Sequence, residues 1–123
     1  MNNKVGSIEQ LKKAIVELVV AAWRFRRVFE KAMTKIDLGE SNRYARQLRW
    51  FLKEADSALE EAGLRIVNVE GQAFDVGMAV TPLNMEDFSI EDKLFVEQML
   101  EPIIMEGEVV LKTGTVILRR VAQ

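Results

Sequence analysis

The side chains that most often carry enzyme chemistry are missing from this sequence of 123 residues. It contains no His and no Cys, so the commonest general base, the commonest metal ligand and every thiol nucleophile are absent. The carboxylates, Lys, Tyr, Ser and Thr that remain show no spacing that would pair a nucleophile with a base. We therefore expect no catalytic residues, and we interpret the protein as one that is not an enzyme.

Metal and nucleotide sites are not indicated either. The acidic stretch 86–92 lacks the alternating oxygen ligands and the turn glycine of a calcium loop. Gly107 and Gly114 belong to neither Gly-x-x-x-x-Gly-Lys nor Gly-x-Gly-x-x-Gly, the two patterns that cradle phosphates. We expect no metal and no cofactor.

The charged side chains are divided unequally along the chain. Residues 1–63 carry 12 basic and 9 acidic side chains, whereas residues 64–123 carry 5 and 10. The composition is otherwise that of an average globular chain, with 49% hydrophobic and 29% charged residues. This asymmetry predicts two domains that face different partners, residues 1–63 and residues 64–123.

The first domain begins with a long helical pattern. Apolar residues recur at heptad a and d positions from Ile8 to Ile36, and Ser7 with Gln10 fits a capping box at the start. We expect this stripe to be core. A second apolar stripe lies on an adjacent face, and one partner helix would leave it in water. It consists of Val16, Val19, Val20 and Trp23. The helix is therefore predicted to be buried on two sides, in a bundle or a dimer.

A second helical pattern runs from Arg43 to about Ala62. Ser41 or Asn42 can cap it, and Gly63 stands where a helix-ending glycine is expected. Two helices joined by about five residues must run antiparallel. Residues 1–63 are thus predicted to form a helical hairpin, and two copies would form a four-helix bundle. We expect the dimer interface to include Ile15, Leu18, Ala22, Phe25, Phe29, Leu48 and Phe51.

The second domain shows short β patterns instead. The predicted strands are 64–69, 74–80, 108–112 and 115–121, with a tight turn at 113–114 between the last two. The segment 89–104 fits either a helix that begins near Ser89 or a strand interrupted at Pro102. The predicted fold class is therefore α+β, with a helical hairpin followed by a small, mainly antiparallel β domain.

The boundary between the two domains resembles a known family. Residues 61–75 contain a helix-ending glycine, a short strand and the sequence Gly-Gln-Ala-Phe-Asp at 71–75. This order is similar to the entry into the β domain of GrpE-family nucleotide exchange factors. The similarity continues at 78–80 and at 110–112 with Val116, and it covers roughly residues 45–123.

The resemblance implies a function and a set of contact residues. In the family, proteins dimerise through helices, and a β domain holds open the nucleotide cleft of a DnaK-type heat-shock chaperone. Such a ligand speeds nucleotide exchange because it binds the open state better than the closed one. Our leading hypothesis is a homodimeric cochaperone of this kind, acting on a DnaK-type ATPase or a relative. The residues expected at the partner contact are Asp75, Met78, Glu108, Lys112, Arg119 and Arg120.

A structural adaptor is the alternative hypothesis. Glu108 and Lys112 stand where the family has arginines, and the His-Glu pair before its Ala-Val is missing. An adaptor would use the same dimeric hairpin and would dock through the β domain without any effect on nucleotide exchange.

Basic residues gather toward the turn of the predicted hairpin and fit either a solvated face or a contact for an acidic partner. They are Arg24, Arg27, Lys31, Lys35, Arg43, Arg46, Arg49 and Lys53. Because the sequence pI is about 5.3 and no reader motif is present, we expect no specific nucleic-acid binding. No apolar run reaches the roughly 18 residues of a membrane span, and the first seven residues are polar. We expect a cytoplasmic protein.

Overall fold

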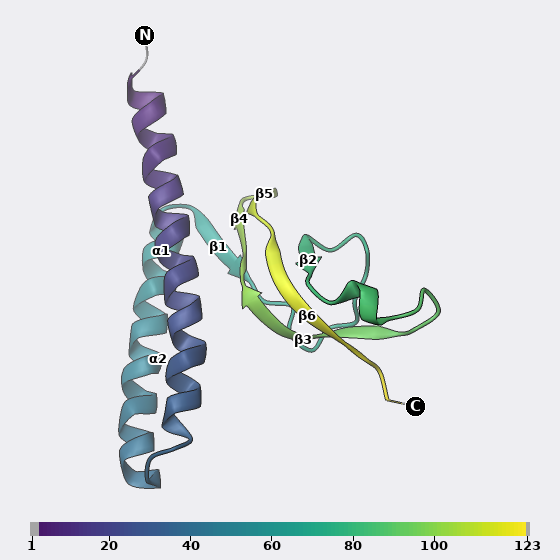
Figure 1. Ribbon diagram of the computed structural model, residues 1–123. Helices are drawn as coiled ribbons and strands as arrows, with labels where there is room; N and C mark the ends of the chain where they lie inside the picture. The colour runs from purple at the N-terminus through teal and green to yellow at the C-terminus, as the bar shows by residue number, and fades with distance from the viewer. Residues whose placement is uncertain (1–2, 123) are drawn as a thin grey trace. The chain divides into compact units, whose positions relative to one another are not determined.

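In the computed structural model, which describes residues 3–122, the chain divides into two compact units, Met1–Gly63 and Leu64–Gln123. The first unit contains two helices, and the second consists of short strands (Figure 1). The predicted α+β fold class is confirmed, because a helical pair precedes a small and mostly antiparallel β unit.

The first helix, α1 (Asn3–Met33), packs beside the second, α2 (Leu38–Glu61), as a hairpin (Figure 1). Because α1 already begins at Asn3, the predicted capping box at Ser7 and Gln10 is wrong. The single glycine in this segment, Gly6, costs a helix only about 1 kcal/mol relative to Ala, so it does not stop the helix from extending.

The start of α2 is capped by Asp37, not by Ser41 or Asn42 as the sequence suggested. The Asp37 Oδ1 atom accepts a hydrogen bond from the backbone N–H of Glu40 at 3.0 Å. This carboxylate accepts an N–H of the first turn that has no partner within the helix, so the helix begins at Leu38, five residues before the predicted start at Arg43.

The end of α2 follows the sequence. Gly63 adopts φ 77°, and its N–H donates to the carbonyl oxygen of Glu60 at 3.0 Å. A left-handed residue just past a helix favours glycine, so the predicted helix-ending glycine is confirmed.

The hairpin buries a different stripe of α1 from the one we expected. Among the described residues of the hairpin, the buried hydrophobic side chains are Val19, Trp23, Leu48 and Leu59. In the predicted heptad stripe, by contrast, Leu11, Leu18 and Phe25 are 63%, 71% and 53% exposed. The expectation that this whole stripe is core within one chain is therefore wrong. Both stripes are apolar, and a single partner helix can cover only one side of α1.

The second unit contains two three-stranded sheets. The first has the order β1-β4-β5 and is antiparallel; its strands are β1 (Leu64–Val67), β4 (Ile103–Glu106) and β5 (Val109–Lys112). The second has the order β2-β6-β3; its strands are β2 (Val80–Pro82), β3 (Leu94–Glu101) and β6 (Gly114–Arg120). In this sheet β2 runs parallel to β6 and β3 runs antiparallel to it. A short 3-10 turn, η1 (Met85–Asp87), follows β2.

The core of this unit is continuous across strands of both sheets. Val96, Met99, Ile104 and Val116 are fully buried. The other buried hydrophobic residues of the unit are Leu64, Val69, Leu94, Ile103 and Leu118.

The observed strand pairing decides between helix and strand for the segment 89–104, and it corrects the strand predicted over 74–80. The segment 89–104 contains β3 and the first residues of β4, so the strand alternative is confirmed and the helical one is wrong. Pro102 separates the two strands, because it has no N–H to continue a ladder. The strand predicted over 74–80 is wrong apart from Val80. Here the Asp75 carboxylate accepts the N–H of Gly77 at 3.0 Å and closes a turn instead.

The turn predicted at 113–114 is wrong as well. The hairpin turn lies at Gly107, which adopts φ 59° and joins β4 to β5. The next strand, β6, leaves β5 and joins the other sheet. Gly114 serves close packing at this crossover, since an added Cβ would lie 2.6 Å from Met99 Cε and 3.0 Å from Ile103 Cγ1.

Candidate protein-interaction site

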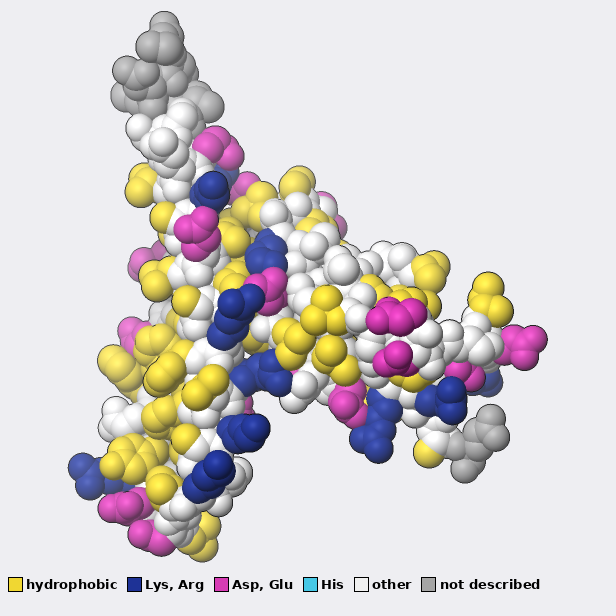
Figure 2. All heavy atoms as spheres, viewed as in Figure 1, with side chains coloured by type: hydrophobic (Ala, Val, Ile, Leu, Met, Phe, Trp, Pro, Cys, Tyr) yellow, Lys and Arg dark blue, Asp and Glu magenta, His cyan; other side chains and the backbone are white. Residues whose placement is uncertain are grey.

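An apolar groove of about 670 Å³ lies along the hairpin, lined by α1 and α2. Its lining residues are Ile15, Leu18, Val19, Ala21, Ala22, Phe25, Trp50, Phe51, Glu54, Ala55, Ala58 and Leu59. Figure 2 shows hydrophobic side chains gathered along the hairpin, with Lys and Arg side chains beside them. Large exposed apolar patches on soluble proteins mark binding surfaces. The groove is therefore the candidate site of the helical unit.

Most of the predicted dimer-interface residues line this groove. They are Ile15, Leu18, Ala22, Phe25 and Phe51. Leu18 is 71% exposed and Phe51 is 40% exposed, so both are available to a partner. Leu48 lies elsewhere: it is only 7% exposed and belongs to the buried stripe of the hairpin.

Phe29 belongs to an aromatic cluster at the end of the groove nearer the helical turn. Its ring centroid lies 5.6 Å from that of Phe25 and 6.3 Å from that of Tyr44, with an edge-to-face angle of 87° to the tyrosine. Edge-to-face and tilted pairs are favourable arrangements of aromatic rings. The cluster joins α1 to α2, and Phe25 belongs both to it and to the lining of the groove.

Trp50 also lines the groove, although the sequence favours a packing role for it over an interface contact. Its side chain is 60% exposed. Tryptophan is enriched among residues that dominate binding energy, which makes Trp50 a strong candidate contact.

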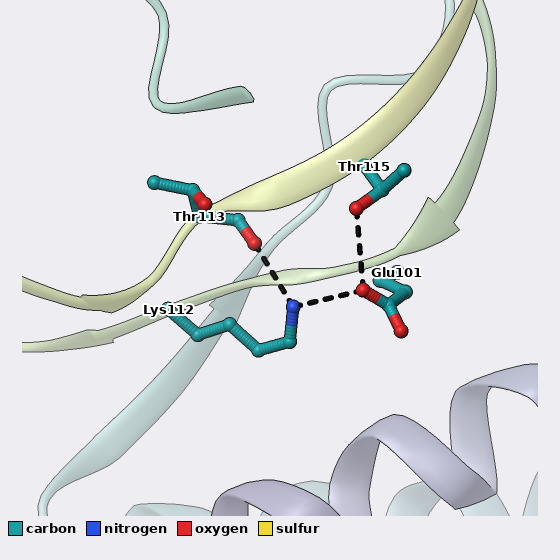
Figure 3. A network of polar contacts seen from close by, with 4 residues as sticks. All are labelled: Glu101, Lys112, Thr113 and Thr115. Atoms are coloured by element: carbon teal, nitrogen blue, oxygen red, sulfur yellow. Dashed lines mark hydrogen bonds and ion pairs between the residues drawn. The ribbon is translucent and has the colours of Figure 1, made fainter. Parts of the chain in front are cut away.

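In the β unit, the predicted contact residue Lys112 belongs to a polar network (Figure 3). Its Nζ donates to Glu101 Oε1 at 3.0 Å and to the carbonyl oxygen of Thr113 at 3.1 Å. The Thr115 hydroxyl donates to the same Glu101 oxygen at 3.2 Å. The side chains of Lys112 and Glu101 are only 24% and 21% exposed, so this ion pair is partly desolvated. Lys112 is therefore held in one place at the crossover from β5 to β6.

The two predicted arginines of β6 pair with carboxylates of their own unit. Arg119 contacts Glu97 at 2.9 Å, and Arg120 contacts Asp92 at 3.1 Å. The pKa of Asp92 is lowered, chiefly because the backbone N–H of Ser89 donates to its carboxylate and also because Arg120 lies beside it. Both arginines are well exposed, at 70% and 59%, and can still reach a partner.

The predicted partner residues do not form a single cluster. Lys112 is tied through Glu101 to Thr115 near the start of β6, whereas Arg119 and Arg120 end that strand. Five residues of extended strand separate Thr115 from Arg120, which is about 17 Å. A partner that touches both groups must therefore cover the length of β6.

The remaining predicted residues lie on turns. Asp75 uses its carboxylate within its own turn, and its N–H donates to the Met78 sulfur at 3.3 Å. Met78 is half-buried as a result, while Asp75 is exposed. Glu108 is exposed in the turn between β4 and β5.

Neither a metal cluster nor a membrane-spanning helix is found in the part of the chain that the structure describes. No group of three or more Asp or Glu side chains within residues 3–122 could hold a metal ion. Within the same residues, neither helix combines the length and apolarity required to cross a bilayer.

Comparisons with known proteins returned no match: no family model fits the chain, and no curated protein or solved structure is significantly similar to it. The functional argument therefore depends on the groove of the hairpin, the charged residues of the β unit and the resemblance in the sequence.

Proposed function

We propose that this protein is a homodimeric, cytoplasmic cochaperone of the GrpE kind. The hairpin associates with a second copy through its apolar groove, and the β unit binds the ATPase domain of a DnaK-type chaperone or a relative. Binding favours the open nucleotide cleft and accelerates exchange, so the protein performs no chemistry of its own.

The exposed apolar groove is the observation that carries this proposal. Leu18, Phe25 and Trp50 are each more than half exposed beside a cavity of about 670 Å³. Full burial of one such side chain stabilises an assembly by about 1.5–3 kcal/mol. Two antiparallel hairpins that face each other through these grooves form a four-helix bundle, in which the second copy covers the apolar face that the first leaves bare.

The assignment to a chaperone partner rests on the sequence resemblance over residues 45–123. The charged residues of β6 give this assignment a physical basis. Arg119 and Arg120 are long cations at the end of a rigid strand, and they are oriented by Glu97 and Asp92. Pre-oriented cations of this kind favour an acidic surface on the partner.

The direct test is a stopped-flow measurement of ADP release from a DnaK-type chaperone with and without the protein. The proposal predicts faster release that saturates with protein concentration. Arg119→Glu should weaken the effect, whereas Lys13→Glu, a charge reversal at an exposed position of α1 outside the predicted contact, should not. If the protein does not bind the chaperone and does not change its rate of ADP release, the proposal is wrong.

The adaptor hypothesis is supported by one specific feature. Lys112, Arg119 and Arg120 all form ion pairs within their own unit, and the length of β6 separates Lys112, at the end of β5, from the two arginines. A surface whose charges are already paired in this way can dock on the ATPase at least as well as it can hold the nucleotide cleft open. Binding to the ATPase without acceleration of ADP release would select the adaptor.

A further inference from the structure

The charged side chains of α2 change sign along the helix. The part nearer the hairpin turn, residues 38–53, contains one carboxylate, Glu40, and four cations, Arg43, Arg46, Arg49 and Lys53. Residues 54–61 contain four carboxylates and no cation. Two of these, Glu60 and Glu61, stand in the last turn of α2, where the helix dipole disfavours negative charge. The charges at this end do not stabilise their own helix, which points to a role outside it.

This change of sign runs along the rim of the apolar groove. Trp50 and Glu54 line the groove. Arg43 lies seven residues before Trp50, and Glu61 lies seven residues after Glu54, and residues seven apart share one face of a helix. All four side chains are exposed. The α2 rim of the groove therefore carries a cation nearer the turn and carboxylates nearer the open end of the hairpin.

The row formed by these four residues is complementary to itself in the antiparallel direction. When α2 packs on α2 of a second copy with Leu52 at the midpoint, Arg43 of each copy lies at the level of Glu61 of the other. The ion pair thus forms twice, once on each side of the midpoint. Pairs of this kind between neighbouring helices set the direction in which two helices associate.

The apolar stripe of α1 that lines the groove is also matched to itself in this direction. In an antiparallel pair of α1 helices centred on Val20, Leu18 lies at the level of Ala22, and Ile15 lies at the level of Phe25. All four of these side chains line the groove. Each therefore meets an apolar partner, with no charged residue placed in the seam.

One two-fold axis can serve both helices. The ring contact between Phe29 and Tyr44 shows which levels of α1 and α2 lie side by side in the hairpin. Val20 lies nine residues before Phe29, and Leu52 lies eight residues after Tyr44. Because the two helices run in opposite directions, the two midpoints lie at nearly the same height.

We propose that the second copy covers the groove with its turn at the opposite end, so that α1 packs antiparallel on α1 and α2 on α2. The proposal rests on the dimer of hairpins proposed above and adds the direction of the partner. In the other face-to-face arrangement both turns lie at the same end, and the two basic ends of α2 come together. Like charges brought together disfavour an interface, so charge complementarity selects the antiparallel dimer.

The direction can be measured with spin labels, because the chain has no Cys and an introduced one is the only label site. Asn42→Cys and Glu60→Cys place labels at exposed positions near the two ends of α2, outside the groove lining. These positions are separated by about 27 Å along a helix. In the antiparallel dimer, position 42 of one copy lies near the level of position 60 of the other, whereas two labels at 42 are separated by about 30 Å along the bundle.

Pulsed electron paramagnetic resonance on each labelled variant and on their equal mixture separates the outcomes. The antiparallel dimer predicts a short distance that appears only in the mixture. A short distance in each single sample, with no shorter one in the mixture, would place both turns at one end and overturn this inference while the dimer stands. A protein that sediments as a single chain would instead overturn the proposed dimer itself.

Charge reversal tests the ion pair at the rim. Arg43→Glu should weaken the dimer by about tenfold in Kd, because two pairs of opposite charge become two pairs of like charge. Adding Glu61→Arg to this variant should restore the affinity. Arg49→Glu, the same charge change on a different face of α2, is the matched control and should change the Kd less. If Arg43→Glu tightens the dimer, or if the double variant associates no better than Arg43→Glu alone, the antiparallel contact is wrong.

Discussion

The two units of this protein differ in how completely they bury their own apolar side chains. Among the described residues, the β unit has nine buried hydrophobic side chains, drawn from four of its six strands and the segment after β1, and four of these are fully buried. The hairpin is of similar length but has four, and it leaves large side chains such as Leu18, Phe25 and Trp50 exposed. The β unit thus buries its own core, whereas the hairpin leaves an apolar face exposed, which is the face that the proposed dimer would cover.

We expect the largest loss of stability from a substitution in the core of the β unit. Ile104→Ala removes a fully buried side chain and should destabilise this unit by about 2–5 kcal/mol. Both tryptophans lie in the hairpin, so their fluorescence reports that unit, while NMR signals of β-unit backbone amides report the other. The amide signals of the β unit should be lost at lower denaturant concentration. A variant as stable as the original would contradict the claim that this core supports the unit by itself.

The next effect concerns the crossover between the two sheets. Gly114→Ala would place a Cβ 2.6 Å from Met99 Cε and 3.1 Å from the backbone oxygen of Glu101. Overpacking of this kind costs typically about 1–3 kcal/mol. Gly77→Ala is the matched control, because its nearest neighbour would be at 3.7 Å and its backbone has no left-handed φ. Equal unfolding midpoints in urea for the two variants would show that the crossover is not tightly packed.

A smaller effect is expected from the polar network that holds Lys112. Glu101→Gln removes the charge partner of Lys112 while it keeps the shape of the side chain. The pair is partly exposed, so the loss should be on the order of 1 kcal/mol. Glu108→Gln, an exposed carboxylate on the adjacent turn, should change the unfolding free energy less. The reverse ranking would argue against a structural role for the network.

The smallest effect is a dependence of stability on pH at Asp92. Its folded pKa is lowered from the usual 3.8, because the ionised form accepts the Ser89 N–H and lies beside Arg120. The ionised form is thus favoured in the folded state, so its contribution is present above the unfolded pKa and is lost as the pH falls through the folded pKa. Asp92→Asn should therefore lower the melting temperature at neutral pH and make less difference at about pH 2. If the difference in melting temperature between Asp92→Asn and the original protein does not change with pH, or if the Asp87→Asn control shows the same change, this assignment is wrong.

Several features of the fold follow from local sequence patterns. The two helices and the glycine at 63 could be predicted, because helical periodicity and a left-handed helix end are local properties. The start of α2 was placed too late, since Asp37 caps it from outside the apolar pattern.

Strand partners could not be predicted in the same way. β5 and β6 are neighbours in sequence but belong to different sheets. The choice depends on contacts between distant segments, such as Gly114 against Met99, which no local pattern contains.

The candidate groove was predictable in part. The heptad spacing of α1 indicated Leu18 and Phe25, but two apolar stripes of similar strength left open which of them α2 would cover. For Trp50 the sequence allowed either a packing role or an interface contact, and only its exposure in the structure favours the interface.

The most direct test of the account is the mass of the protein in solution, measured by sedimentation equilibrium at low micromolar concentration. The account predicts twice the 14.0 kDa of one chain for the natural sequence. Leu18→Glu should give a mass near 14.0 kDa while the β unit stays folded, because the residue is exposed in one chain and buried only in the assembly. A natural protein that sediments as a single chain, or a Leu18→Glu variant that remains dimeric, would contradict the claim that the groove of the hairpin is completed by a second copy.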